Sequence, residues 1–177
     1  AGSGCNAASS NISYDVNGNV ASRTDFSGNK TCYAYDITRN LEIGRIEGLS
    51  SSSNCPGDIP SYIPTANSSE RKTLTTWHAN FRIPTSITEA GRETNFVYDT
   101  HGNVTQHQIK DTATNATRTW TTSYVYHATI PGIILQKTEN GPRTDVSDIT
   151  TTQYYLPDAA CAGGHKGCRA QVASITN

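Results

Sequence analysis

The sequence predicts an all-β fold, an antiparallel strip of β-hairpins that repeats along the chain as a solenoid-like curved sheet. Two stretches carry this prediction, since Tyr14 to Tyr35 and Trp77 to Tyr98 are both 21 positions apart. A fixed period of this size is typical of arrays whose units bury their apolar faces against one another. The 34% hydrophobic content and the 25 threonines favour one thin sheet with many turns over two packed layers.

Each unit is predicted to be a strand, a turn and a second strand. Asp15 to Gly18 combines an acceptor side chain with residues that tolerate positive φ, which is typical of a hairpin turn. Alternation then places Tyr33 and Tyr35 on one face, and each aromatic pair across neighbouring strands adds roughly 0.2–1 kcal/mol. The repeat residues assigned in this way are Tyr14, Asp15, Gly18, Gly28, Tyr33, Tyr35, Asp36, Trp77, Gly91, Phe96, Tyr98, Asp99, Gly102, Tyr124 and Tyr126.

The aspartates of this pattern have two interpretations. Asp15, Asp36 and Asp99 each follow a tyrosine and precede a turn. A carboxylate could act as an acid, a base or a metal ligand, and tyrosine could bind a sugar or a cation. Aspartate is nevertheless favoured at this position because its side chain accepts local backbone hydrogen bonds. We therefore predict a structural role for these pairs.

The repeated motif resembles that of a known family. Tyr14 to Asn19 and Tyr98 to Asn103 have the pattern Tyr-Asp-x-x-Gly-Asn, and Tyr35 to Asn40 has it with Arg39 in place of the glycine. These motifs, with the stretches TCYAYDITRNLE, TTWHANFRIPTSI and NGPRTDVSDIT, resemble the YD repeats of Rhs (rearrangement hot spot) proteins, bacterial members in particular. The resemblance covers most of residues 14–177.

The resemblance implies both a fold and a role. Chains of this family wind a long antiparallel strip into a hollow shell, which in bacterial toxins encloses a C-terminal effector domain. Related repeats form the barrel of the teneurins, which are adhesion receptors. The repeat region is not itself the enzyme in either case. The self-cleavage motif of bacterial shells, of the type DPxGL, has no counterpart because the sequence contains no Asp-Pro pair.

Later units depart from the pattern. Tyr98 to Tyr126 is 28 positions and Tyr126 to Tyr155 is 29, and the residues that follow the last two tyrosines are His127 and Leu156. We expect longer or bulged hairpins in this part of the chain.

The domain organisation is predicted as a flexible lead-in over residues 1–12 and a repeat region over 13–177. A loop insertion is expected at about 49–76, where Pro56, Pro60 and Pro64 exclude a central strand. A surface loop anchored by Cys55 is favoured over a binding loop. Pro84 should begin a strand or mark a bulge, and the last strand is expected at 170–175.

The five cysteines suggest an oxidising compartment. We predict two disulfides, one between Cys32 and Cys55 and one between Cys161 and Cys168, which bracket a glycine-rich loop. Cys5 is then left over, which suggests either an intermolecular partner or a partner cysteine lost by excision from a longer chain. Together these features favour a secreted or cell-surface location, and the resemblance to Rhs proteins implies a bacterial one.

Three groups of residues could bind a metal ion, but a structural interpretation is favoured for each. Cys161, His165 and Cys168 offer three ligands without a fourth or a typical zinc spacing. Asp145, Ser147 and Asp148 lack the pattern of a calcium loop. The remaining histidines could form a cross-strand cluster, but His78 also stands where the repeat has aspartate; they are His78, His101, His107 and His127. Nucleophile elbows, P-loops and HExxH motifs are absent, so we assign no catalytic residue, metal or cofactor.

Charge and hydropathy exclude two further classes. The net charge is −1, from 14 Lys and Arg against 15 Asp and Glu, which argues against nucleic-acid binding. No apolar run approaches the roughly 20 residues of a membrane span.

The first functional hypothesis is a non-catalytic segment of a β-shell that encloses a toxin domain or displays another domain, paired with flanking repeats of a larger parent chain. The alternatives are a self-assembling extracellular filament, in which identical copies join by strand addition at open sheet edges, and an adhesion module that grips surface glycans through exposed Tyr and Trp.

Overall fold

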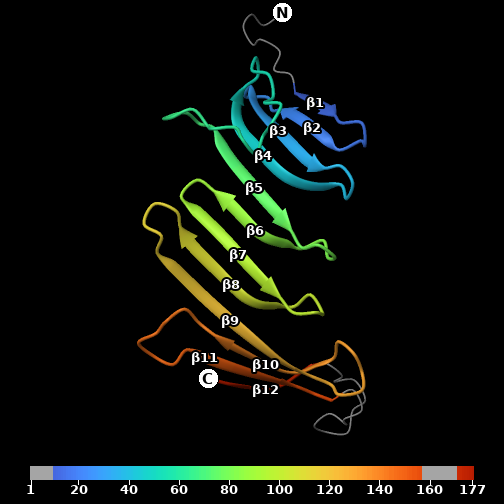
Figure 1. Ribbon diagram of the computed structural model, residues 1–177, viewed down its shortest axis with the longest axis vertical. Coiled ribbons are helices and arrows are strands. Elements are labelled where there is room, and N and C mark those ends of the chain that lie inside the picture. Colours follow the sequence, from blue (N-terminus) through green and yellow to red (C-terminus); the bar gives the residue numbers. More distant parts are fainter. Residues whose placement is uncertain (1–9, 157–170) are drawn as a thin grey trace, which may run out of the picture. The chain divides into compact units, whose positions relative to one another are not determined.

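The computed structural model describes residues 10–156 and 171–177. Within these residues, twelve antiparallel strands form a single open sheet in which the strand order follows the chain order (Figure 1). This confirms the predicted all-β hairpin strip. The strands are β1 Asn11–Tyr14, β2 Val20–Thr24, β3 Asn29–Asp36, β4 Leu41–Ser50, β5 Arg71–Trp77, β6 Pro84–Glu89, β7 Arg92–Tyr98, β8 Val104–Asp111, β9 Thr117–Tyr126, β10 Ile134–Asn140, β11 Ile149–Tyr154 and β12 Val172–Thr176.

The chain forms two compact units, Ala1–Glu93 and Thr94–Asn177. Most successive strands are joined by short turns, the exceptions being β4 and β5, which a loop at 51–70 connects, and β11 and β12, whose connection lies largely outside the described residues. Register shifts interrupt several pairs, for example between Ser13 and Tyr14 in β1 and between Gln153 and Tyr154 in β11. These two shifts fall next to the tyrosine that ends the strand, whereas the shifts between Lys30 and Cys32 in β3 and between Ile134 and Gln136 in β10 do not.

Glycine supplies the left-handed residue of the tight turns. Gly18 and Gly102 have φ values of 82° and 83°, a conformation that other residues adopt at a cost. In the turn after Asp36 the positive φ, 50°, falls instead on Asn40, and asparagine tolerates that conformation. This shift explains how Arg39 can stand where the other copies have glycine.

The apolar core lies on one face of the first unit. Cys32 and Ile46 are register partners on β3 and β4, and both are fully buried. Leu49 and Ile59 complete the buried cluster. Ala34, Tyr62 and Leu74 pack against it, so the core is a thin layer between the sheet and the loop that joins β4 to β5.

The ends of the predicted insertion are strands and not loop. β4 continues to Ser50 and β5 begins at Arg71, so the loop spans residues 51–70 (Figure 1). The polar stretch after Glu70 pairs with β4, with Arg71 opposite Glu47. The residues RKTLTTW form an ordinary strand here because β4 supplies the hydrogen-bonding partners.

The two chain ends also differ from the predicted bounds. Asn11 and Ile12, placed in the lead-in, belong to β1 and pair with Thr24 and Arg23. The last strand is β12, at Val172–Thr176, which lies slightly later than predicted. Pro84 begins β6, as expected for a residue without an N–H.

Candidate functional site

The aspartate of each tyrosine-aspartate pair accepts hydrogen bonds from its own turn. Asp15 Oδ1 lies 2.9 Å from the backbone nitrogen of Asn17 and 2.8 Å from that of Asn19. The side-chain hydrogen bond from Asn19 is the main cause of a lowered pKa at Asp15, and backbone N–H groups add to it. Asp99 accepts from His101 and Asn103 in the same way, both at 2.9 Å. These carboxylates therefore close turns.

Histidine takes the place of aspartate in two turns. His78 Nδ1 accepts from the backbone nitrogens of Asn80 and Phe81, at 3.1 and 3.2 Å. His127 Nδ1 accepts from the backbone nitrogens of Thr129 and Ile130, at 3.2 and 3.1 Å. An imidazole nitrogen thus performs the task that a carboxylate oxygen performs in the other copies.

Arginine side chains connect neighbouring turns of the first unit. The Arg39 guanidinium donates to the carbonyls of His78 and Phe81, at 2.8 and 2.9 Å. In return, Arg82 donates to the carbonyls of Arg39 and Asn40, at 2.8 and 3.1 Å. The two arginines form a reciprocal latch. Sequence reasoning missed this latch, although a charged residue in place of the motif glycine was a signal for it.

Asn17 joins the first of these turns to the second. Its side-chain nitrogen donates to the carbonyl of Ile37 at 2.8 Å and to Oδ1 of Asn40 at 3.0 Å. Three consecutive turns of one sheet margin, those that follow β1, β3 and β5, are therefore connected by side chains.

Tyrosine makes the corresponding connection in the second unit. The Tyr126 hydroxyl donates to the Asp99 carboxylate and accepts from Asn103 Nδ2 at 2.8 Å. The His101 ring stacks on Tyr126 with centroids 4.3 Å apart. Burial, together with the hydrogen bond to Asp99, raises the pKa of Tyr126 to about 12.

The repeat aromatics pair along strands. Tyr33 with Tyr35 and Phe96 with Tyr98 are stacked, with centroids 6.4 and 6.2 Å apart. Tyr124 and Tyr126 lie 5.9 Å apart and are tilted. Trp77 instead donates its indole N–H to the carbonyl of Glu42 at 2.7 Å.

One aromatic stack crosses strands, and a histidine completes it. The His107 ring on β8 lies between Phe96 on β7 and Trp120 on β9, with centroid distances of 5.1 and 5.0 Å. His101 and His107 are thus each held against aromatic rings, and His78 and His127 are held in turns. No group of metal-ligating side chains occurs among the residues that the structure describes.

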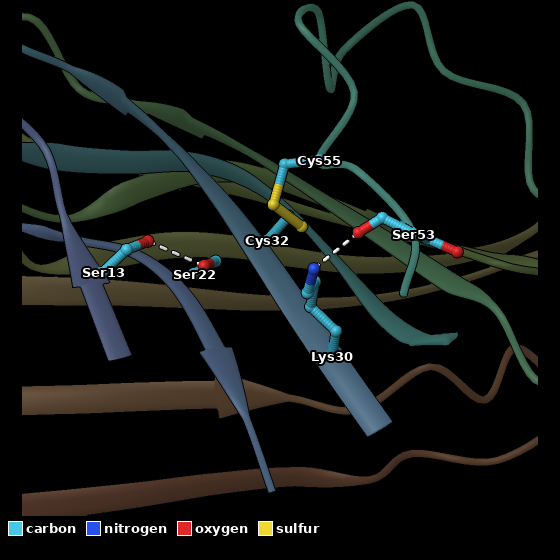
Figure 2. Close-up of a disulfide and its surroundings, with 6 residues drawn as sticks. All are labelled: Ser13, Ser22, Lys30, Cys32, Ser53 and Cys55. Carbon is cyan, nitrogen blue, oxygen red and sulfur yellow. Dashed lines mark hydrogen bonds between the residues drawn. A yellow bond between two sulfur atoms is a disulfide. The ribbon is translucent and has the colours of Figure 1, made fainter. Parts of the chain in front are cut away.

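The loop at 51–70 is fastened to the sheet by several independent contacts. Cys55 is bonded to Cys32 on β3, with the two Cα atoms 5.6 Å apart, and the Lys30 ammonium donates to the carbonyl of Ser53 (Figure 2). Ile59 enters the core. Lys72 donates to the carbonyl of Tyr62 at 2.7 Å. These contacts hold the loop against β3, β5 and the apolar core.

A cavity of about 410 Å³ opens on the first unit. Its lining has four basic side chains, Arg45, Arg71, Lys72 and Arg92, against two acidic ones, Glu47 and Glu89. Arg45 pairs with Glu42 and Glu47 at 2.9 and 3.2 Å, Arg92 pairs with Glu89, and Lys72 donates to the carbonyls of Pro60 and Tyr62. Because most of these basic groups are engaged within the chain, we assign the cavity no ligand.

The remaining predicted sites are either engaged elsewhere or outside the described residues. The Asp145 carboxylate pairs with Arg143 at 2.8 Å, and Asp148 Oδ2 accepts from the Arg143 backbone nitrogen at 3.3 Å. The predicted pair Cys161–Cys168, the alternative ligand His165 and the leftover Cys5 lie outside the described residues. A helix able to cross a membrane is absent from the described part of the chain.

Comparison with known proteins shows a likeness of fold. No protein-family model and no curated protein matches the chain. Among solved structures, it is similar to a chain of the Photorhabdus luminescens Tc holotoxin pore with a TccC3 mutation, with a TM-score of 0.50 and 12% identity, over 80% of this chain and 7% of that one. It is also similar to a chain of the TcdB2-TccC3-TEV crystal structure, with a TM-score of 0.51 and 12% identity, over 82% and 7%. The chain thus spans about 7% of the length of these chains.

Proposed function

We propose that the chain is a non-catalytic structural segment of a secreted bacterial β-shell of the Rhs/YD-repeat type, which encloses or displays another domain. The observation that carries this proposal is the use of the motif residues. The carboxylates of Asp15 and Asp99 and the imidazoles of His78 and His127 accept hydrogen bonds from their own turns. Side chains of one turn also contact the next turn. A sheet whose turns are connected in this way is suited to a structural role as part of a shell wall.

The outer strands support continuation of the wall. Ile12 and Tyr14 on β1 are 46% and 63% exposed, and Val172 and Ile175 on β12 are 49% and 62% exposed. Neither strand contains a lysine, another charged residue or a proline, which are two of the usual means of protecting a free edge. We infer that further strands of a longer chain cover both edges.

The fold likeness supports the same view. In the Tc toxin structures a sheet of this kind is a small part of a long chain, since the matched region is 7% of that chain. The resemblance of the repeated Tyr-Asp motif to Rhs repeats is independent of this likeness because it rests on sequence.

The test is to place charge on the outer strands. If both edges pair with further strands in the parent protein, the isolated chain should associate at micromolar concentration. The double variant Ile12→Lys, Ile175→Lys should instead be a 19.1 kDa monomer. Val97→Lys and Val125→Lys are matched controls, because these residues are 50% and 51% exposed on inner strands. Analytical ultracentrifugation measures the mass of each protein. A monomeric unmodified chain would contradict the proposal, and so would control variants that reduce association as much as the edge variant does.

A further inference from the structure

Two turns of the chain are closed by a histidine acceptor. In each, the ring Nδ1 accepts from the backbone nitrogens two and three residues later. The backbone nitrogen of His78 also donates to the carbonyl of Ile83 at 2.9 Å, and that of His127 donates to the carbonyl of Ile133 at 2.8 Å. In each turn, two backbone N–H groups therefore point at Nδ1, and a backbone hydrogen bond closes the turn around them.

Asp111 provides a matched turn within the same chain. Its Oδ1 accepts from the backbone nitrogens of Ala113 and Thr114, both at 2.8 Å, which is again two and three residues later. Its backbone nitrogen donates to the carbonyl of Ala116 at 2.9 Å, a span of five residues that equals the span at His78. Aspartate and histidine thus hold turns of the same hydrogen-bonding pattern.

The two acceptors respond differently to acid. A neutral imidazole has one acceptor nitrogen, and because that nitrogen is Nδ1 here, the ring proton must be on Nε2. A second proton makes both ring nitrogens donors, so Nδ1–H would face two N–H groups. Histidine gains this proton near pH 6.5 in ordinary surroundings, whereas aspartate loses its charge only near about pH 4.

We propose that the turns at 78–83 and 127–133 are acid-sensitive and open in mildly acidic solution, while the aspartate turns stay closed. The inference is independent of the proposed function, since it depends only on hydrogen bonds within the chain.

The turn at His78 is connected to its neighbour by two arginines. The His78 ring stacks on Phe81 at 4.9 Å, and its carbonyl accepts from the Arg39 guanidinium. Arg82 belongs to the same turn and reaches the turn that begins at Asp36, whose Oδ1 accepts from the Arg39 backbone nitrogen at 3.3 Å. Opening of the turn at His78 would therefore withdraw the carbonyls to which Arg39 donates.

The turn at His127 is connected to its surroundings through Thr129 and through the preceding Tyr126. The Thr129 hydroxyl lies 3.3 Å from Nδ1. The preceding residue, Tyr126, donates to the Asp99 carboxylate and is stacked by His101. Opening of this turn should therefore disturb the latch between Tyr126 and Asp99, which gives a second observable.

The experiment is amide hydrogen exchange by NMR on the full chain at pH 7.5 and pH 5.0, with each rate referred to the intrinsic rate at that pH. Protection of the Asn80, Phe81, Thr129 and Ile130 amides should fall by about tenfold at the lower pH, as loss of one or two hydrogen bonds requires. Protection of Ala113 and Thr114 should change less than about twofold, because their carboxylate acceptor is retained.

Substitutions identify the acceptor. His78→Asp and His127→Asp should abolish the loss at their own turns, and Asp111→His should introduce it at Ala113 and Thr114. His78→Asn serves as a second variant, since an amide oxygen accepts at either pH without a charge. Full protection of the four amides at pH 5.0 would overturn the proposal, and so would an equal loss in the Asp and Asn variants.

Discussion

At the residue scale, the position after each strand-ending aromatic determines how the chain turns. The location of Asp15 and Asp99 before Asn and Gly residues was sufficient to expect local hydrogen bonds, because the acceptor and the donors are close in sequence. The partners of Tyr126 were not predictable in this way. Asp99 is 27 residues away from it, and their contact depends on the lengths of two intervening turns.

Gly48 illustrates a residue whose backbone geometry excludes a side chain. Its φ is 80°, and a Cβ atom would lie 2.3 Å from the carbonyl oxygen of Ser69. We expect Gly48→Ala to lower the free energy of unfolding by about 2 kcal/mol, from strain and from displacement of the loop end. Urea unfolding followed by circular dichroism measures this change. Gly57→Ala is the control, because nothing lies within 4 Å of its Cβ position, and an equal loss there would contradict the explanation.

The contact between Tyr126 and Asp99 predicts a dependence on alkaline pH. The folded-state pKa of Tyr126, about 12, is above the ordinary value of about 10. The stabilisation is therefore complete below pH 10 and is lost as the pH rises from 10 to 12. Tyr126→Phe should cost about 1 kcal/mol at pH 7 and should flatten this part of the stability profile. An unchanged profile in the variant would contradict the assignment.

The contact between Tyr126 and Asp99 also predicts how the free energy of unfolding changes in acid. Desolvation raises the pKa of Asp99, but hydrogen bonds from Tyr126 and from two backbone N–H groups outweigh it, so the net pKa is lowered. The stabilisation from this carboxylate is present above pH 4 and is lost as the pH falls through the lowered folded-state value. Asp99→Asn should remove this dependence, which urea titrations between pH 2 and 5 can measure.

At the element scale, the loop at 51–70 behaves as a cover for β3 to β5. Its prolines correctly excluded a strand, but they gave no sign that Ile59 would be 3% exposed. That burial depends on where the disulfide and the two lysines place the loop. The predicted bounds were also too wide, because Leu49 and Ser50 extend β4 and the threonines at 73, 75 and 76, which favour a strand, belong to β5.

The disulfide should stabilise the first unit by roughly 3 kcal/mol, through the chain entropy of a closed loop of this length. We expect the double variant Cys32→Ala, Cys55→Ala to unfold at correspondingly lower urea. Chymotrypsin should then cleave faster after Tyr62, whose ring packs on the core. The control is treatment of the variant with dithiothreitol. The reductant acts on any other disulfide of the chain, so unchanged cleavage after Tyr62 would assign the effect to the Cys32–Cys55 bond.

The arginine latch predicts coupled energies. Arg39→Ala should cost about 1–2 kcal/mol and Arg82→Ala less than about 1 kcal/mol, because the Arg82 contacts are the more exposed. In a double-mutant cycle the two should couple by about 0.5 kcal/mol or more. The exposed Arg118 serves as a neutral control. Strict additivity would show that the two arginines act independently.

At the scale of the whole molecule, the fold class could be predicted because a hairpin strip is built from local contacts. The regular spacing, the turn glycines and the low hydrophobic content each pointed to a single sheet, and the strand order follows the chain order. Contacts that depend on register could not be predicted. The position of His107 between Phe96 and Trp120 is one of these, since bulges and turn lengths determine which side chains face one another.

The central claim is that this sheet is a segment of a longer wall with two edges that require partners. The measurement that tests it most directly is the mass and morphology of the purified chain, by light scattering and electron microscopy over a range of concentrations. The account predicts irregular, concentration-dependent association that edge lysines abolish. Long regular filaments would contradict it and make assembly between copies the function, and a stable monomer that binds glycans saturably would contradict it in favour of an adhesion module.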